Sequence, residues 1–484
     1  MTSSLKEQTI IGMIWQAIQG FGNRIILFIA NLILAQLLAP DDFGCIGMLM
    51  ILLSISNVFI NGGFSLALLQ KKVVTKADYS TVFYWNLIIA LVAYFLLFYF
   101  SPAISVFYRI PLLSTVLRVQ GLALIFNALS VVQITILQQQ LNFKKIAIYD
   151  LISVSIACSA GIITALLGWG VWSLVLKMML YYIMNSMILW LFSSWKPELI
   201  FSLKSFKELF GFGSFLFLSN LMRELYYCIP NLIIGRCYSA RRLGFYTQAR
   251  KLEEIPVVTL ATIVSSVSYP VYSKLQDERE RLIRGVRKNQ KAITFINFPM
   301  MVLLIVIAKP LFLILFTEKW SESVPYFQLL CIGGMMITLV YLNKDLITSL
   351  GNSKKYFLIE IIYEVLGILL MFGGSFLYGI EGLLGGFALS YYFLFGISAV
   401  VSGQLTQYGL VTQLKDVGMN LILSLLIGIV VYFFSFLFST YYYLLIIQIS
   451  TYLLLYLGVA HLLGLEGYQI FLKIIQDKFI KTNR

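Results

Sequence analysis

The sequence predicts an all-α polytopic membrane protein with about fourteen transmembrane helices, in two six-helix lobes of parallel repeat plus two extra C-terminal helices. Three observations support this fold class. The chain is 60% hydrophobic and 12% charged, whereas soluble domains are roughly 45–50% apolar and about 25% charged. Apolar segments long enough to cross a bilayer follow one another with short connections. Finally, sequence motifs from the first half of the chain recur in the second half.

Each span is expected to be a helix, because a backbone in lipid must satisfy its own hydrogen bonds. The first apolar segment continues through Leu38 without a small-residue cleavage site, so it is predicted to be an uncleaved span rather than a signal peptide. The two longest connections, 194–208 and 271–290, are basic. The expected helices cover residues 8–38, 42–70, 77–101, 111–140, 144–167, 171–193, 209–238, 242–270, 291–317, 323–350, 355–379, 381–407, 415–439 and 441–463.

The distribution of lysine and arginine predicts the orientation. With the N-terminus inside, the cytoplasmic segments hold 23 of these residues and the outside segments hold four. Cytoplasmic loops of membrane proteins carry such an excess, so both termini are expected in the cytoplasm. From Tyr468 the tail alternates apolar and basic faces, which predicts a short helix on the inner membrane surface.

Two pairs of similar sequence segments indicate an internal repeat. "NLILAQLLAPDDFG" from Asn31 returns as "NLIIGRCYSARRLG" from Asn231, and "NFKKIAIYDLI" from Asn142 returns as "NSKKYFLIEII" from Asn352. Six spans bring the chain back to its starting side, so the two copies share one orientation, which is one of the main transporter plans. The predicted parts are a lobe at 1–193, a cytoplasmic interfacial linker at 194–208, a lobe at 209–407, helices 13–14 at 408–463 and a cytoplasmic amphipathic tail at 464–484.

The residue inventory excludes several functions. His461 is the one histidine, and no Gly-Lys dipeptide is present, so His-based metal centres, catalytic triads and a nucleotide P-loop are all excluded. We therefore expect no catalytic residue, no metal and no cofactor. The net charge of +14 is assigned to membrane topology rather than to nucleic-acid binding. The five cysteines fall in apolar segments and are interpreted as buried small residues.

Two arginines stand at nearly equivalent places in the two repeats. Arg24 and Arg223 both lie about 22–24 Å from the outer helix ends, where a charge needs a partner or an aqueous cavity. Each belongs to a polar helix face that includes Asn23 and Asn31 in the first lobe, and Asn220, Glu224 and Asn231 in the second. These faces predict a shared substrate cavity. The alternative is a buried salt-bridge network with Glu224 as its acid.

The segment "LGFYTQARKLEEIP" places a second basic cluster near mid-membrane. Arg250 is followed by Glu253 and Glu254 at the i+3 and i+4 positions, so internal pairing is expected there in part. Lys251 is expected to point away from this group of paired side chains. A small positive excess in a wide cavity suits an anionic substrate head.

The chain resembles the Wzx-like polysaccharide (O-antigen/exopolysaccharide) flippases of the multidrug/oligosaccharidyl-lipid/polysaccharide exporter superfamily. The resemblance rests on "ILAQLLAPDDFG", "GGFSLALLQKK", "LGFYTQARKLEEIP" and "YPVYSKLQDERERL", and is strongest over 1–290. It implies two lobes around a cationic cavity in the bacterial cytoplasmic (inner) membrane. It also implies translocation of an undecaprenyl-pyrophosphate-linked oligosaccharide for O-antigen, capsule or exopolysaccharide synthesis, with membrane lipid as a second partner. Proton or sodium coupling and contact with a polysaccharide polymerase stay open.

Two other functions have different requirements, which the sequence can be compared with. A multidrug or small-molecule antiporter of the same superfamily would need a net acidic cavity for its cations, and the basic excess argues against it. A membrane polymerase or ligase of the same pathway would need a sizeable outside loop with catalytic arginine or histidine. The longest outside loop expected here has about ten residues, too few for such a catalytic site.

Overall fold

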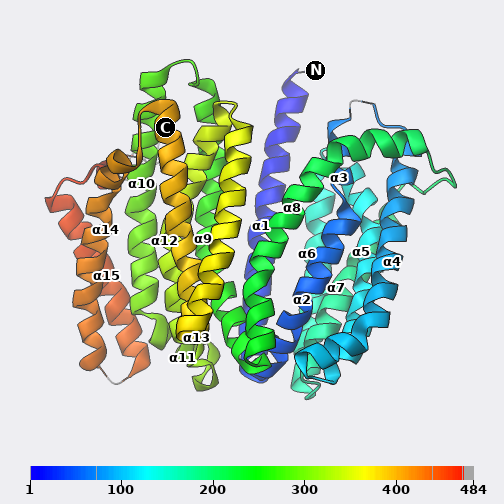
Figure 1. Cartoon of the computed structure of the whole chain (residues 1–484), viewed down its shortest axis with the longest axis horizontal. Helices are drawn as coiled ribbons and strands as arrows, with labels where there is room; N and C mark the ends of the chain where they lie inside the picture. The colour runs from blue at the N-terminus through cyan, green and yellow to red at the C-terminus, as the bar shows by residue number, and fades with distance from the viewer. Residues whose placement is uncertain (1, 72, 439, 471, 474–484) are drawn as a thin grey trace. The chain divides into compact units, whose positions relative to one another are not determined.

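The computed structural model describes residues 2–71, 73–438, 440–470 and 472–473, and within them no strand occurs (Figure 1). The all-α fold class is confirmed. The helices are α1 (Thr2–Leu37), α2 (Pro40–Asn61), α3 (Phe64–Gln70), α4 (Lys76–Tyr108), α5 (Leu112–Gln139), α6 (Phe143–Leu166), α7 (Val171–Phe192), α8 (Leu203–Cys237), α9 (Ala240–Lys274), α10 (Arg279–Val306), α11 (Ala308–Phe316), α12 (Ser323–Ser349), α13 (Ser353–Thr406), α14 (Leu410–Tyr432) and α15 (Tyr441–Leu462).

Twelve helical segments of the described chain are long and apolar enough to cross a membrane. That number takes α13 as one span and does not include α8. Helix α13 is interrupted at Tyr378 and Gly379, where Gly379 has a φ of 64°. Treating it as two spans and adding α8 accounts for the difference from the fourteen expected.

The chain divides into two compact units, residues 1–247 and 248–484. In the first unit, α4 packs on α5, α6 packs on α1 and α7, and α8 packs on α2, α3 and α4. The boundary between the units lies inside α9 (Ala240–Lys274), after Thr247. The lobe boundaries that the repeat predicts stay a prediction.

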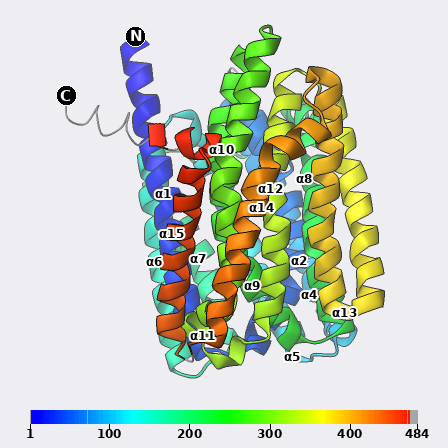
Figure 2. The ribbon, with the colours of Figure 1, turned by 90° about the vertical axis from the view of Figure 1, so that its left-hand side faces the viewer.

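In the second unit, α12 packs against α10 and α13, and α14 packs against α10 and α15 (Figure 2). Short α11 follows α10 after a break at Ile307 and contacts α12 and α15. The expected single helix over 291–317 is therefore two helices.

A pair of glycines ends α2 within the span expected at 42–70. Gly62 and Gly63 have φ values of 49° and 74°, a region that favours glycine because it lacks a Cβ. A Cβ on Gly63 would also lie 2.4 Å from the carbonyl oxygen of Gly213 in α8. The break thus permits a backbone contact between α3 and α8 that a larger residue would prevent.

Buried charged side chains join the start of α4 to α8 in the first unit. Thr75 caps α4 in a reciprocal capping box with Asp78, whose side chain is 1% exposed. Lys71 bonds to Asp78 at 3.1 Å and to Glu208 of α8 at 3.0 Å. Burial alone would lower the pKa of Lys71, but these hydrogen bonds outweigh it and raise the pKa. The lysine therefore stays charged and links the start of α4 to α8.

The prediction of a long basic connection over residues 271–290 is wrong. Helix α9 continues to Lys274 and α10 begins at Arg279, so the helices extend through most of it. Local ion pairs support the extension of α10, with Arg281 2.6 Å from Glu278 and Arg284 3.6 Å from Glu280. Charged residues with helical pairing form helix outside the apolar span, which hydropathy alone does not predict. Of the predicted tail helix, residues 471 and 474–484 lie outside the described residues.

Candidate substrate-binding site

The polar face of α1 is anchored to an acid that the sequence reasoning missed. Asn23 Nδ2 and Gln19 Nε2 each donate to Asp150 Oδ2 of α6 at 2.6 Å. Tyr181 of α7 donates its hydroxyl to Asp150 Oδ1 at 2.9 Å. Asp150 is 8% exposed, so a carboxylate in the first unit is buried among neutral donors. An acid inside an apolar span is a functional candidate by default, and this signal was present in the sequence.

Asn23 is thereby placed as a ligand of Asp150 rather than as a side chain free to bind substrate. Its Oδ1 is buried and has no hydrogen-bond partner among the described residues. Arg24 and Asn31 are half-buried farther along the same helix.

The second polar face lies on α8. Arg223 is exposed, and its Nη2 donates to Asn220 Oδ1 at 2.7 Å. Within the described chain no ion pair joins Arg223 to Glu224. Glu224 instead lies 3.9 Å from the thiol of Cys228, one turn further on. Asn231 is half-buried directly after Pro230. The described residues therefore do not form the Arg223–Glu224 salt bridge of the alternative, and the substrate cavity stays a prediction.

Arg250 is paired as the sequence suggested. Its Nη1 lies 2.9 Å from Glu253 Oε2, and the glutamate is 1% exposed. The guanidinium also lies over the ring of Phe387 at 5.3 Å from its centroid. One neighbour therefore balances its charge, whereas Lys251, next in the chain, is exposed. Arg250 is a weaker candidate for an anionic ligand than Arg223.

Two further observations concern ionisable residues within the spans. Lys344 forms an ion pair with Glu360 of α13. Cys237 is exposed, whereas the other four cysteines are buried as predicted. Among the described residues no group of three or more metal-binding side chains occurs.

The repeated segment forms a reciprocal backbone contact. A Cβ on Gly44 of α2 would lie 1.7 Å from the carbonyl oxygen of Ala240, and one on Gly244 of α9 would lie 1.9 Å from that of Pro40. Each copy of the motif therefore needs glycine at the same place, because each helix start rests on the backbone of the other. This contact lies at the end of the spans predicted to face outside.

Comparison with known proteins decides the family. The sequence pattern of a family described as "Polysaccharide biosynthesis protein" matches residues 33–325, more than half of the chain. The chain belongs to the polysaccharide biosynthesis protein family. The resemblance noted from the motifs is confirmed at this level.

Curated members of the polysaccharide biosynthesis protein family align over most of the chain. It is 24% identical over 374 residues to the "Teichuronic acid biosynthesis protein TuaB" of Bacillus subtilis (strain 168), covering 77% of this chain and 76% of that protein. It is 25% identical over 339 residues to the "Succinoglycan biosynthesis transport protein ExoT" of Rhizobium meliloti (strain 1021), covering 70% and 69%. It is also 25% identical over 339 residues to the "Lipopolysaccharide biosynthesis protein WzxC" of Escherichia coli (strain K12), covering 69% and 68%.

Solved structures share the fold of this family member. The "Lipid II flippase MurJ" in an inward closed conformation superposes with a TM-score of 0.77 at 18% identity, covering 93% of this chain and 98% of that one. An inward-facing multidrug resistance MATE family transporter of the MOP superfamily superposes with a TM-score of 0.62 at 15% identity, covering 79% and 96%. At these identities the likeness establishes the fold alone.

Proposed function

We propose that this protein is a flippase that moves an undecaprenyl-pyrophosphate-linked oligosaccharide from the inner to the outer leaflet of the bacterial cytoplasmic membrane. The observation that carries the proposal is Arg223. It lies about 21 Å along α8 from Cys237, since a helix rises 1.5 Å per residue, yet it is exposed and bonded to an amide. A guanidinium at that depth is stable beside water or an anion, not beside lipid.

The family members named above support this substrate class. Their names concern teichuronic acid, succinoglycan and lipopolysaccharide, and one is named a transport protein. A lipid-linked glycan requires cations for its pyrophosphate and polar groups for its sugars. Arg24 and Arg223 supply the first, and Asn31, Asn220 and Asn231 supply the second. Glu224 and the Arg250–Lys251 pair complete the proposed substrate-binding set, and no bond-making chemistry is assigned to any of them.

Energy for outward movement comes from the membrane itself in this proposal. With a negative interior, an anion moves outward downhill by about 2.3 kcal/mol per charge per 100 mV. In this proposal both termini lie in the cytoplasm, and a polymerase that receives the glycan outside is a natural partner.

Loss of the gene in the bacterium that carries it tests the function. Surface polysaccharide should disappear, and the lipid-linked oligosaccharide should accumulate where impermeant glycan-modifying reagents cannot reach it. The wild-type gene supplied in trans should restore both. If the oligosaccharide still became accessible from outside at the normal rate, the proposal would be wrong.

A further inference from the structure

The cytoplasmic extension of α10 lines a basic cavity in the second unit. Arg284, Arg287, Lys288 and Lys291 are spaced three and four apart, so they share one helix face. The cavity has a volume of about 610 Å³, and its opposite wall includes Glu466 and Lys473, from the segment that follows α15. Five bases and one acid therefore line it.

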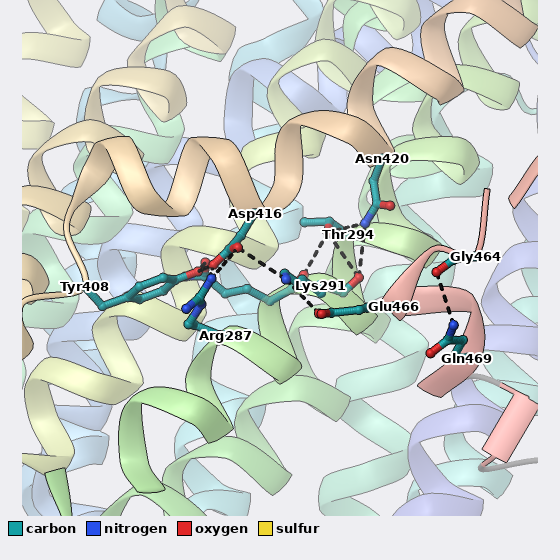
Figure 3. A network of polar contacts seen from close by, with 10 residues as sticks. Arg287, Lys291, Thr294, Tyr408, Asp416, Asn420, Gly464, Glu466 and Gln469 are labelled. Atoms are coloured by element: carbon teal, nitrogen blue, oxygen red, sulfur yellow. Dashed lines mark hydrogen bonds and ion pairs between the residues drawn. The ribbon is translucent and has the colours of Figure 1, made fainter. Parts of the chain in front are cut away.

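Two carboxylates hold two of these bases in place (Figure 3). Arg287 bonds to Asp416 of α14 in a bidentate pair, with Nε at 2.8 Å from Oδ2 and Nη2 at 2.9 Å from Oδ1. Lys291 Nζ lies 3.3 Å from Asp416 and 2.7 Å from Glu466. Bidentate pairs of this kind fix geometry as well as charge. The cavity is thus built on α10, α14 and the segment after α15.

A tyrosine completes this support. The hydroxyl of Tyr408 donates to Asp416 Oδ2 at 2.9 Å. Burial, followed by the hydrogen bond to Asp416, raises the pKa of Tyr408 well above its ordinary value. The hydroxyl therefore keeps its proton and remains a hydrogen-bond donor. Asp416 is thus held in place beside the cavity by Tyr408 and Arg287.

The other three bases are available to a ligand. Arg284, Lys288 and Lys473 are exposed. Among the described residues neither lysine forms an ion pair, and Arg284 has a 3.6 Å pair with Glu280, which is itself 89% exposed. Exposed pairs of this type contribute little. The cavity consequently keeps a positive surplus that its own acids do not balance.

The neighbouring surface indicates where the anion comes from. Leu454 and Leu462 of α15 are 73% and 83% exposed, and Leu463, directly after the helix, is 51% exposed. In a membrane-spanning helix such leucines contact acyl chains. The cavity begins at Glu466, three residues beyond Leu463, so it adjoins the end of this apolar span. A free phosphate would gain nothing from this apolar border.

We propose that this cavity binds the phosphodiester head group of an anionic phospholipid on the cytoplasmic side, with its acyl chains along α15. Basic pockets at the cytoplasmic ends of transmembrane helices take such head groups. The bound lipid would tie the segment after α15 to α10. This site is distinct from the substrate site and does not depend on the proposed transport function.

The test uses the full-length protein in mild detergent and measures retained lipid by native mass spectrometry. Phosphatidylglycerol and phosphatidylcholine are added in equal amounts. The wild type should retain phosphatidylglycerol preferentially. Each base near an anionic lipid contributes roughly a fivefold change in affinity, so the variant Arg284→Ala/Lys288→Ala/Lys473→Ala should weaken retention by at least about tenfold.

The matched control removes three exposed bases that are also predicted to be cytoplasmic but lie outside the cavity, in Lys204→Ala/Lys207→Ala/Lys274→Ala. It should retain phosphatidylglycerol as the wild type does. Equal retention by the wild type and the cavity variant would overturn the proposal. Displacement of the lipid by millimolar inorganic phosphate would assign the cavity to free anions and overturn its lipid part. The single change Lys288→Glu provides the same comparison if the triple variant is unstable.

Discussion

Replacement of Arg24 or Arg223 by alanine is expected to abolish export of the polysaccharide while leaving the protein in the membrane at its normal level. In the proposed function, each change removes a charge-assisted hydrogen bond to the pyrophosphate. Such a bond is worth about 1.5–3 kcal/mol, so the rate of translocation should fall roughly 10- to 100-fold. The measurement is surface polysaccharide against protein quantity in membranes, with the lipid-linked intermediate followed in parallel.

Lysine at either position separates charge from geometry. Arginine bonds phosphate in a bidentate manner that lysine cannot reproduce. Arg24→Lys and Arg223→Lys should therefore give intermediate export. Lys309→Ala serves as the matched control, because this exposed base lies near the start of α11 rather than on a polar face, and it should export normally.

A double variant distinguishes the cavity from a salt bridge. If Arg223 acted by neutralising Glu224, then Arg223→Ala combined with Glu224→Ala should restore the export that the single change lost. The hydrogen bond from Arg223 to Asn220 leads us to expect no restoration. Full export from Arg24→Ala at normal protein level would remove that residue from the site.

A disulfide between α2 and the first turns of α9 is expected to stop transport completely. A Cβ on Gly47 would lie 2.9 Å from Cγ2 of Thr247, so cysteines at both positions come within the 3.5–4.5 Å that a disulfide requires between Cβ atoms. This contact adjoins the reciprocal Gly44–Gly244 contact at the predicted outer end. We expect these helix starts to separate when the substrate is released outside.

The cross-link experiment requires a background in which the five native cysteines are replaced. Oxidised Gly47→Cys/Thr247→Cys protein should be inactive, and reduction should restore export. Each single cysteine variant, oxidised in the same way, is the control and should remain active. Undiminished export by the fully cross-linked protein would show that these helices stay together throughout transport.

Apolar length was sufficient to predict most of the fold. The spans follow from hydropathy, and the break at Gly62 and Gly63 follows from residues that no continuous helix favours. The charged first part of α10 could not be predicted in this way, since its residues form helix through local ion pairs rather than through apolar periodicity. The repeat gave two matching motifs, but the reciprocal contact of Gly44 and Gly244 required coordinates.

The candidate site was also predictable only in part from the sequence. Arg24 and Arg223 are visible in the sequence because a base in an apolar run is costly. Asp150 is equally costly, but its partners Gln19, Asn23 and Tyr181 come from two distant helices, so no local spacing links them. The pairing of Arg250 with Glu253 was predictable because both lie on one helix, whereas that of Lys344 with Glu360 joins two helices.

The most direct measurement is lipid translocation by the purified protein. Full-length protein is reconstituted into liposomes that carry a fluorescent undecaprenyl-pyrophosphate oligosaccharide in both leaflets, and an impermeant glycosidase is added outside. We predict that the wild type exposes the inner-leaflet pool to complete cleavage, whereas Arg24→Ala/Arg223→Ala leaves that pool protected. Protection by the wild type equal to that in protein-free liposomes would contradict the account.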